Sequence, residues 1–386
     1  MHKRPYQDPP DRQQRPRRDE FLTLDAGLRL SMEACDANLR HLAICIKREQ
    51  AIARDHAFVE QVNETFESLS FLIRDNDGRA YIAWEASGAR DIHRSISFHI
   101  YNMGALARVN GVRLNMSMLE FILTRLLNQP RVDAKSISNG LYGLGLLAHA
   151  NRLDGHMGAR LISELLTRLH ACRDIDAQAV SNTLYGVGLL AQANPLDGHL
   201  DARLISELLT RLYSCQDVHA QAVSNTLYGV GLLARANGLD GHLDARLISD
   251  LLTRLHACRD AHAQDMSSTL YGVGLLARVN PLDGHLDARL ISDLLTRLHA
   301  CREIEAQNIS NTLYGVGLLA QANGLDGHMG ARFISDLLVR LHACREIEAQ
   351  KMSNTLYGVG LLARANPLDG RMGARLISDL DRKSVV

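Results

Sequence analysis

The sequence has few aromatic residues, no excess of charge of either sign and no long apolar run. Aromatic residues make up 5% of its 386 residues, and the 43 Lys and Arg residues equal the 43 Asp and Glu residues. This balance argues against purely electrostatic binding to nucleic acid or anionic lipid. No stretch approaches the roughly 18 apolar residues of a transmembrane helix, and the N-terminus lacks the apolar core of a secretory signal. We therefore expect a cytoplasmic protein with no membrane partner.

The cysteines do not have the spacing of a zinc site or of a disulfide framework. Five of the seven occupy equivalent positions of an internal repeat: Cys172, Cys215, Cys258, Cys301 and Cys344. We expect buried thiols in a reducing compartment, and no metal or other cofactor.

What the chain does have is a repeat of 43 residues. Equally spaced tyrosines mark it, each within a segment that reads Ser-Asn-Thr-Leu-Tyr-Gly-Val-Gly-Leu-Leu-Ala or a close variant: Tyr142, Tyr185, Tyr228, Tyr271, Tyr314 and Tyr357. A fixed period of this length is typical of stacked arrays, whose units cannot bury an apolar face alone. The predicted fold is all-α, a right-handed α-solenoid of stacked two-helix repeats.

Each repeat is expected to contain two antiparallel helices, A and B. In residues 174–216, helix A is predicted over 177–193, where an Asn-Pro pair ends it, and helix B over 200–214. Asp197 in the intervening turn is the expected N-cap of helix B. On helix B, Arg203, Glu207 and Arg211 stand four residues apart, the spacing of exposed ion pairs on an outer surface.

Three segments are expected along the chain. Residues 1–20 are basic and rich in proline, which predicts a disordered tail. Residues 21–97 carry two amphipathic patterns without the repeat, which predicts a helical N-terminal cap in which Trp84 packs. Residues 98–386 form the tandem helical repeats, beginning with a degenerate unit around Tyr101 and ending in a truncated one.

A helical wheel of helix A separates a core stripe from an opposite face. Val180, Leu184, Val187 and Ala191 form the stripe. On the other face, one first-turn position varies among otherwise similar repeats: Ser136, Ala179, Ala222, Asp265, Asn308 and Lys351. The position three residues further on is polar throughout: Asn139, Asn182, Asn225, Ser268, Asn311 and Asn354.

One turn beyond this polar position, every repeat has a glycine: Gly143, Gly186, Gly229, Gly272, Gly315 and Gly358. A glycine inside a helix costs about 1 kcal/mol relative to alanine, so its recurrence needs a cause. Either neighbouring helices pack closely there, or a ligand approaches the backbone.

Proteins that recognise one base of single-stranded RNA per repeat need a variable side chain, a recurring polar partner and a patch without side chains. Asp, Asn, Lys, Ser and Ala would favour different base edges. The alternative is neutral variation at an exposed first turn, with glycines used for helix packing. A second varying set could contact phosphates or cap helix A: His149, Gln192, Arg235, Arg278, Gln321 and Arg364.

No catalytic constellation is evident. The Gly-x-Gly of each repeat lacks a third glycine at dinucleotide spacing and lies within a helix. Every candidate side chain recurs once per repeat, and no nucleophile, base and orienting group come together. We expect a protein that is not an enzyme and has no small-molecule substrate.

The A segment resembles a known class of helical repeat. Ser-Asn-Thr-Leu-Tyr-Gly-Val-Gly-Leu-Leu-Ala at 181–191 is similar to the Asn-Thr-Leu-Trp-Ala-Leu-Ala-Lys-Leu helix of octotricopeptide and heptatricopeptide proteins. It also resembles the SKWP repeats of type III effectors from plant-pathogenic bacteria. Asn182, Thr183 and Leu184 match, whereas Tyr185 replaces Trp. The resemblance covers about residues 98–380 and implies an α-solenoid, an RNA ligand in the first class, and translocation into a host cell in the second.

These observations lead to one functional hypothesis and one alternative. The hypothesis is a monomeric, non-catalytic protein that binds single-stranded RNA along the A helices. The alternative is a scaffold of the armadillo or HEAT kind that binds a host protein, favoured by the neutral charge.

Overall fold

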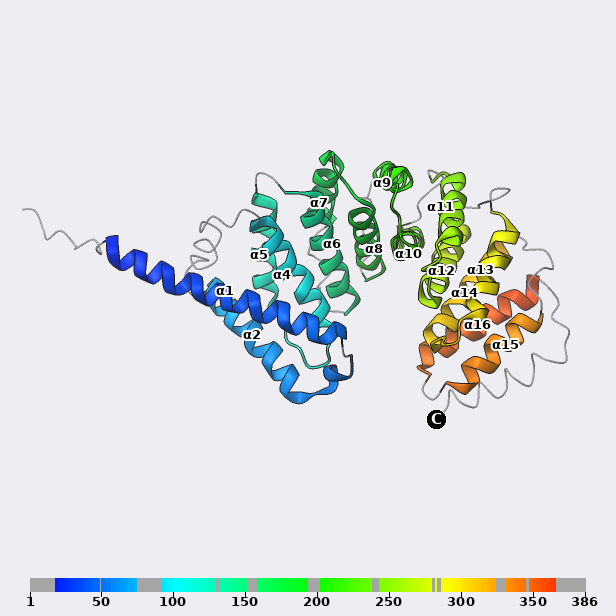
Figure 1. Ribbon diagram of the computed structural model, residues 1–386, viewed down its shortest axis with the longest axis horizontal. Coiled ribbons are helices and arrows are strands. Elements are labelled where there is room, and N and C mark those ends of the chain that lie inside the picture. Colours follow the sequence, from blue (N-terminus) through cyan, green and yellow to red (C-terminus); the bar gives the residue numbers. More distant parts are fainter. Residues whose placement is uncertain are drawn as a thin grey trace, which may run out of the picture.

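The computed structural model is an array of helix pairs preceded by two helices of a different kind (Figure 1). It describes residues 18–48, 50–74, 92–129, 132–150, 159–193, 202–237, 243–279, 282, 286–323, 331–344 and 347–365. These residues include no strand. Three predicted features lie outside the described residues: the tail up to residue 17, Trp84, and the shortened helix B of the truncated last unit.

The A helices form one continuous row. They are α4 (Ile92–Ala107), α6 (Ala134–His149), α8 (Ala177–Ala193), α10 (Ala220–Asn237), α12 (Ala263–Val279), α14 (Ala306–Asn323) and α16 (Ala349–Ala365). Each packs against the A helix before it and the one after it, and these are the most extensive contacts in the molecule. α8 has the bounds predicted for helix A.

The B helices form a second, looser row. They are α5 (Met116–Asn128), α7 (Ala159–Ala171), α9 (Ala202–Ser214), α11 (Ala245–Ala257), α13 (Ala288–Ala300) and α15 (Ala331–Ala343). Figure 1 shows an arch in which the A helices line the inner, concave side and the B helices the outer, convex side. The predicted α-solenoid of two-helix repeats is confirmed.

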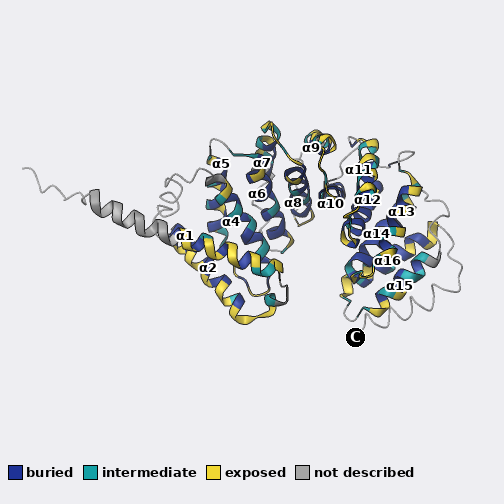
Figure 2. Ribbon diagram, in the orientation of Figure 1, coloured by how far each residue is buried: buried dark blue, intermediate teal, exposed yellow. Residues whose placement is uncertain are grey.

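Burial explains why the two rows have different sequences. The predicted core stripe, Val180, Leu184, Val187 and Ala191, is buried against helix B, and Leu208 and Leu212 of α9 meet it. An A helix also has A helices on both sides, so it is buried over most of its surface, whereas a B helix keeps an exposed outer face (Figure 2). B helices therefore show a clear amphipathic pattern and A helices are apolar or small nearly all round.

Two helices precede the array, α1 (Arg18–Arg48) and α2 (His56–Arg74), joined by a short 3-10 turn, η1 (Gln50–Arg54). Both amphipathic patterns expected in the cap are thus helices. α1 lies against α4, the first A helix, which begins six residues before the predicted start of the array. At this junction the fully buried His99 bonds Asp36 of α1 at 2.8 Å, and Arg40 pairs with the same carboxylate.

Helix caps fix where the B helices begin. Asp244 and Asp287 are the N-caps of α11 and α13, and each accepts a hydrogen bond from the backbone N–H two residues on. Their equivalent in the second repeat is Asp201, four residues after the predicted cap Asp197, and both lie outside the described residues. α9 begins at Ala202, two residues later than predicted.

Candidate functional site: the concave face of the A helices

The recurring glycines bring successive A helices into backbone contact. A Cβ added to Gly145 of α6 would lie 2.5 Å from the carbonyl oxygen of Gly186 in α8, a distance that real Cβ atoms do not reach. One added to Gly186 would likewise strike the backbone of Leu141 and Tyr142 in α6. Close helix packing therefore explains the glycines, and they leave no patch open for a ligand.

This packing buries the variable first-turn position, which was expected to be exposed. Ser136, Ala179, Ala222, Asp265 and Asn308 are 0–8% exposed, and Lys351 is half-buried. The preceding A helix covers them: the side-chain oxygen of Asn308 lies 3.2 Å from the hydroxyl of Ser267 in α12. The expectation that these side chains are exposed and line an open groove is wrong, because the wheel could not show how close the neighbouring helix comes.

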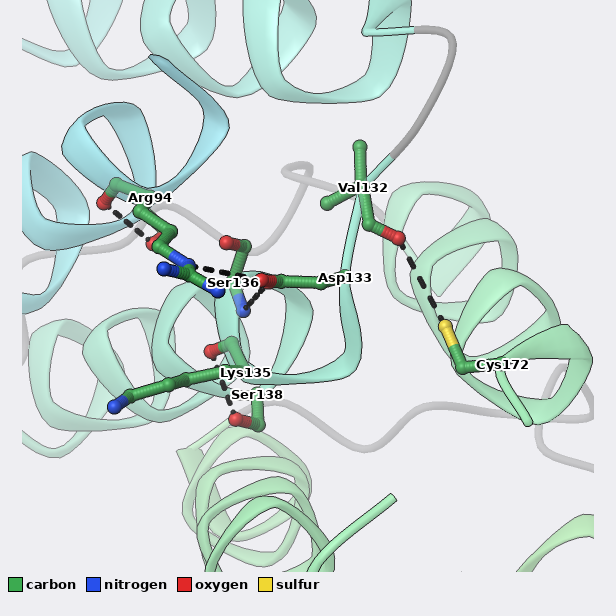
Figure 3. A network of polar contacts seen from close by, with 8 residues as sticks. Arg94, Val132, Asp133, Lys135, Ser136, Ser138 and Cys172 are labelled. Carbon is green, nitrogen blue, oxygen red and sulfur yellow. Dashed lines mark hydrogen bonds and ion pairs between the residues drawn. The ribbon is translucent and has the colours of Figure 1, made fainter. Parts of the chain in front are cut away.

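In two repeats an aspartate N-cap bonds the backbone of the variable residue. Asp133 is the N-cap of α6 and accepts a hydrogen bond from the backbone N–H of Ser136 at 2.8 Å (Figure 3). Asp176 does the same for the N–H of Ala179 in α8. Figure 3 also shows Arg94 of α4 paired with Asp133, which ties the cap to the preceding repeat.

In two later repeats the residue before the helix and the variable residue both differ from those of α8, and their polar groups interact. His262 replaces the aspartate before α12, and there the carboxylate of Asp265 accepts the hydrogen bond from the backbone N–H of His262 at 3.0 Å. Before α16, Glu348 is paired with Lys351 at 2.8 Å. In these two repeats the variable residue thus interacts locally at the helix N-terminus, whereas before α10 His219 replaces the aspartate and the variable residue remains Ala222. Burial raises the pKa of Asp265 above its ordinary value, although the bond from His262 opposes this.

The recurring polar position lies on the concave face, opposite the core stripe. Asn139 and Asn311 are buried, while Asn182, Asn225, Ser268 and Asn354 are half-buried. One turn before them runs a mostly exposed row: Lys135, Gln178, Gln221, Gln264, Gln307 and Gln350. The Nε2 group of Gln178 donates to Oδ1 of Asn182 at 2.7 Å, and Gln307–Asn311 and Gln350–Asn354 repeat this bond. We call these two rows the amide rows.

Beside the amide rows runs a ladder of tyrosine rings that sequence reasoning treated only as a marker of the period. Seven rings follow one another along the concave side, tilted by 33–57° to their neighbours and with centroids 5.4–5.6 Å apart: Tyr101, Tyr142, Tyr185, Tyr228, Tyr271, Tyr314 and Tyr357. A row of leucines, among them Leu189 and Leu232, packs with them into a second apolar cluster. Burial raises the pKa of Tyr142, Tyr185, Tyr228 and Tyr271.

A lysine closes the N-terminal end of the ladder. Lys47 of α1 places its ammonium group 4.2 Å from the centroid of the Tyr101 ring and 2.5 Å from the Tyr101 hydroxyl. A hollow of about 380 Å³ opens beside it, between α1 and the first two A helices. The uniform spacing of the tyrosines is visible in the sequence, but the contacts between their rings depend on how close the neighbouring helices come.

The second varying set is exposed at the C-terminal ends of the A helices, as its sequence position suggested: His149, Gln192, Arg235, Arg278, Gln321 and Arg364. Arg235 reaches the next repeat, where its guanidinium donates to the Tyr271 hydroxyl at 3.4 Å. These side chains border the ladder on the side away from the amide rows.

On the convex side, one arginine of the expected solvated row connects successive repeats. Arg211 donates to the backbone carbonyls of Cys172 and His170, both at 2.8 Å. Two and three repeats further on, Arg297 and Arg340 each bond the equivalent two carbonyls of the preceding repeat. A cation at the carbonyl end of the preceding B helix is favoured by the helix dipole and by charge-assisted hydrogen bonds. The outer-surface interpretation of Arg211 was therefore incomplete.

The repeated cysteines follow the B helices and are half-buried rather than fully buried. The thiol of Cys172 lies 3.8 Å from the carbonyl oxygen of Val132 (Figure 3). Burial raises the pKa of Cys172, Cys215 and Cys258, so these are poor nucleophiles. Within the described residues, His, Cys, Asp and Glu side chains do not gather in groups of three as metal ligands would.

Compared with known proteins, the sequence matches no family model and no curated protein. The resemblance to octotricopeptide and SKWP-type repeats stays a prediction. Among the described helices, none is both long and apolar enough to cross a membrane.

Proposed function

We propose that this protein is a non-catalytic scaffold whose concave face holds an extended segment of another polypeptide. The observation that carries the proposal is the amide rows. In each bonded pair, Gln donates and Asn accepts, which leaves an N–H of the Asn amide and the carbonyl oxygen of Gln for a ligand. A peptide group offers the complementary acceptor and donor.

The amide pairs are nearly the same in every repeat, which favours recognition of the main chain of a ligand. Four repeats carry both amides, and only Lys135 and Ser268 replace a member of the pair in the other two. Ring centroids on this face are 5.4–5.6 Å apart, slightly less than the roughly 6.6 Å spanned by two residues of extended chain. An extended chain whose rise is shortened by twist would meet about one amide pair every two residues.

Single-stranded RNA fits this surface less well. Phosphate groups only accept hydrogen bonds, so the Gln carbonyl oxygens would face them without a donor. The varying side chains expected to distinguish bases are buried or paired within the protein. If the resemblance to effector repeats extends to function, the bound polypeptide belongs to a host cell.

Selection of random displayed peptides on the full chain tests the proposal. Selected peptides should bind the triple variant Asn182→Ala, Asn225→Ala, Asn354→Ala roughly 100-fold more weakly, since three hydrogen bonds at about 1 kcal/mol each are lost. The matched control carries Thr167→Ala, Thr210→Ala and Thr253→Ala on exposed positions of the B helices, and should bind as the parent does.

Two results would overturn the proposal. One is the failure of the selection to enrich any peptide. The other is salt-sensitive binding of a random RNA pool that Arg235→Gln and Arg278→Gln abolish while the triple Asn variant retains it.

A further inference from the structure

The hollow at the N-terminal end of the tyrosine ladder is the end of the concave face rather than a separate cavity. It has a volume of about 380 Å³ and lies where α1 and η1 meet the first two A helices. Tyr101 and Tyr142, the first two rings of the ladder, line it together with Leu146 of the leucine row. Its size is that of a pocket for a small ligand or for one residue of a larger one.

The charged side chains in the described lining of the hollow are both cations. They are Lys47 of α1 and Arg108, in the turn that follows α4, and both are exposed. An ammonium group has three N–H donors, and the Tyr101 hydroxyl accepts one of those of Lys47. Burial raises the pKa of Tyr142 and the charge of Arg108 opposes this shift, which places the guanidinium near that ring. Two cations beside an apolar wall favour a ligand with one anionic and one apolar group.

The amide rows stop one helix before this hollow. In α6 they are represented by Lys135 and Asn139, but α4 has Arg94 and Phe98 at the equivalent positions. Arg94 is paired with the N-cap of α6, and a phenyl ring has neither a donor nor an acceptor for a peptide group. Recognition of a main chain along the A helices therefore ends at α6, and the hollow is the next feature of the concave face.

We propose that the hollow binds a carboxylate attached to an apolar group, and that this is the C-terminal residue of the polypeptide held on the concave face. The inference rests on the proposed function. Lys47 and Arg108 donate charge-assisted hydrogen bonds to the carboxylate, and the last side chain packs on Tyr142 and Leu146. An Asp or Glu within the polypeptide fits less well, because the chain would then have to continue past α4, where α1 and η1 line the hollow.

A small probe tests the hollow without any polypeptide. N-acetyl-leucine, titrated into the full chain and followed by ligand-observed NMR, should bind about tenfold more tightly than N-acetyl-leucinamide. Lys47→Gln and Arg108→Gln should each reduce this preference without lowering the thermal unfolding midpoint, since both side chains are exposed. Arg364→Gln is the matched control: it removes an exposed charge at the position of α16 equivalent to Arg108 and should keep the preference.

Peptides displayed with free C-termini and enriched on the full chain test the source of the carboxylate. Each enriched peptide is synthesised as the free acid and as the C-terminal amide. The acid should bind about tenfold more tightly, and the double variant Lys47→Gln, Arg108→Gln should make the two forms alike. The triple Asn variant should weaken both forms by the same factor, because it acts along the amide rows.

The outcomes separate this inference from the proposed function. Equal binding of N-acetyl-leucine and its amide, or a preference that the double variant retains, would overturn the carboxylate pocket. A preference for the small acid with equal binding of acid and amide peptides would overturn the assignment to a polypeptide end and leave a free acid as the ligand. A selection that enriches no peptide overturns the proposed function alone, and the small probe then decides the pocket.

Discussion

Successive A helices meet backbone to backbone, whereas successive B helices are joined through long arginine side chains. In the A row, Gly188 and Gly229 leave no room for a single methyl group between helices. In the B row, the half-buried guanidinium of Arg297 spans the gap and bonds the carbonyls of His256 and Cys258. The A row therefore tolerates almost no change in side-chain volume, and the B row tolerates changes that keep its hydrogen bonds.

The largest difference between the rows should come from Gly229→Ala. The new Cβ would lie closer than 3.0 Å to backbone atoms of Leu184 and Tyr185, which cannot move aside as a side chain could. We expect the free energy of unfolding, measured by urea denaturation, to fall by about 3 kcal/mol.

Gly360→Ala is the matched control, because it makes the same substitution where a Cβ would have nothing within 4 Å. It should leave stability unchanged or raise it by up to about 1 kcal/mol through helix propensity. Equal changes in stability at Gly229 and Gly360 would contradict the role of backbone contact, because helix propensity alone predicts the same small gain at both positions.

A smaller effect is expected from Arg297→Met in the B row. The variant keeps an apolar side chain of similar length but loses both bonds to the preceding repeat. Since the guanidinium is half-exposed, the expected loss is about 1 kcal/mol in the same denaturation experiment. Arg289→Met, at an exposed position of the same helix, should cost nothing measurable; an equal loss there would contradict a role for the carbonyl contacts.

The smallest effect is expected from Asp265→Asn, and it should depend on pH. Burial raises the pKa of this carboxyl in the folded state, so the parent loses stability as the pH rises through the ordinary aspartate pKa toward the raised one. Asn removes this loss and still accepts the bond from the His262 N–H. The variant should be more stable than the parent at neutral pH, and the difference should vanish well below pH 3.8.

Asn308→Asp, the reverse change at the equivalent position, should introduce a loss of the same sign. Thermal melts across a pH series would measure both variants. A pH-independent difference between Asp265→Asn and the parent would show that the carboxyl titrates alike in the folded and unfolded chains.

Much of the fold could be predicted from the sequence because the repeat supplies the same information several times. The A and B periodicities locate both helices, and the core stripe around Leu184 follows from a wheel. The wheel could not show which of the other faces of helix A are buried. A wheel gives directions, but the burial of Ala179 and its equivalents depends on the interhelix distance, which the glycines determine only once the helices are stacked.

The candidate site was predicted only in part, because a wheel gives directions and not the distances between helices. The recurring amides were identified correctly as a polar row, and the structure adds the Gln partner one turn earlier. The pairing of His262 with Asp265 could have been recognised from their three-residue spacing at a helix start. The tyrosine ladder could not, because rings 43 residues apart approach only when neighbouring helices are nearly in contact.

Backbone contact along the A row also has a mechanical consequence. Because successive A helices already touch through their glycines, the distance between them cannot decrease. The inner edge of the arch therefore keeps a constant length. Any flattening or tightening of the curve must be taken up on the outer side, by sliding of the B helices and rotation of the arginines that connect them. A ligand seated on the inner edge would therefore meet an invariant spacing of groups, whatever the rest of the arch does.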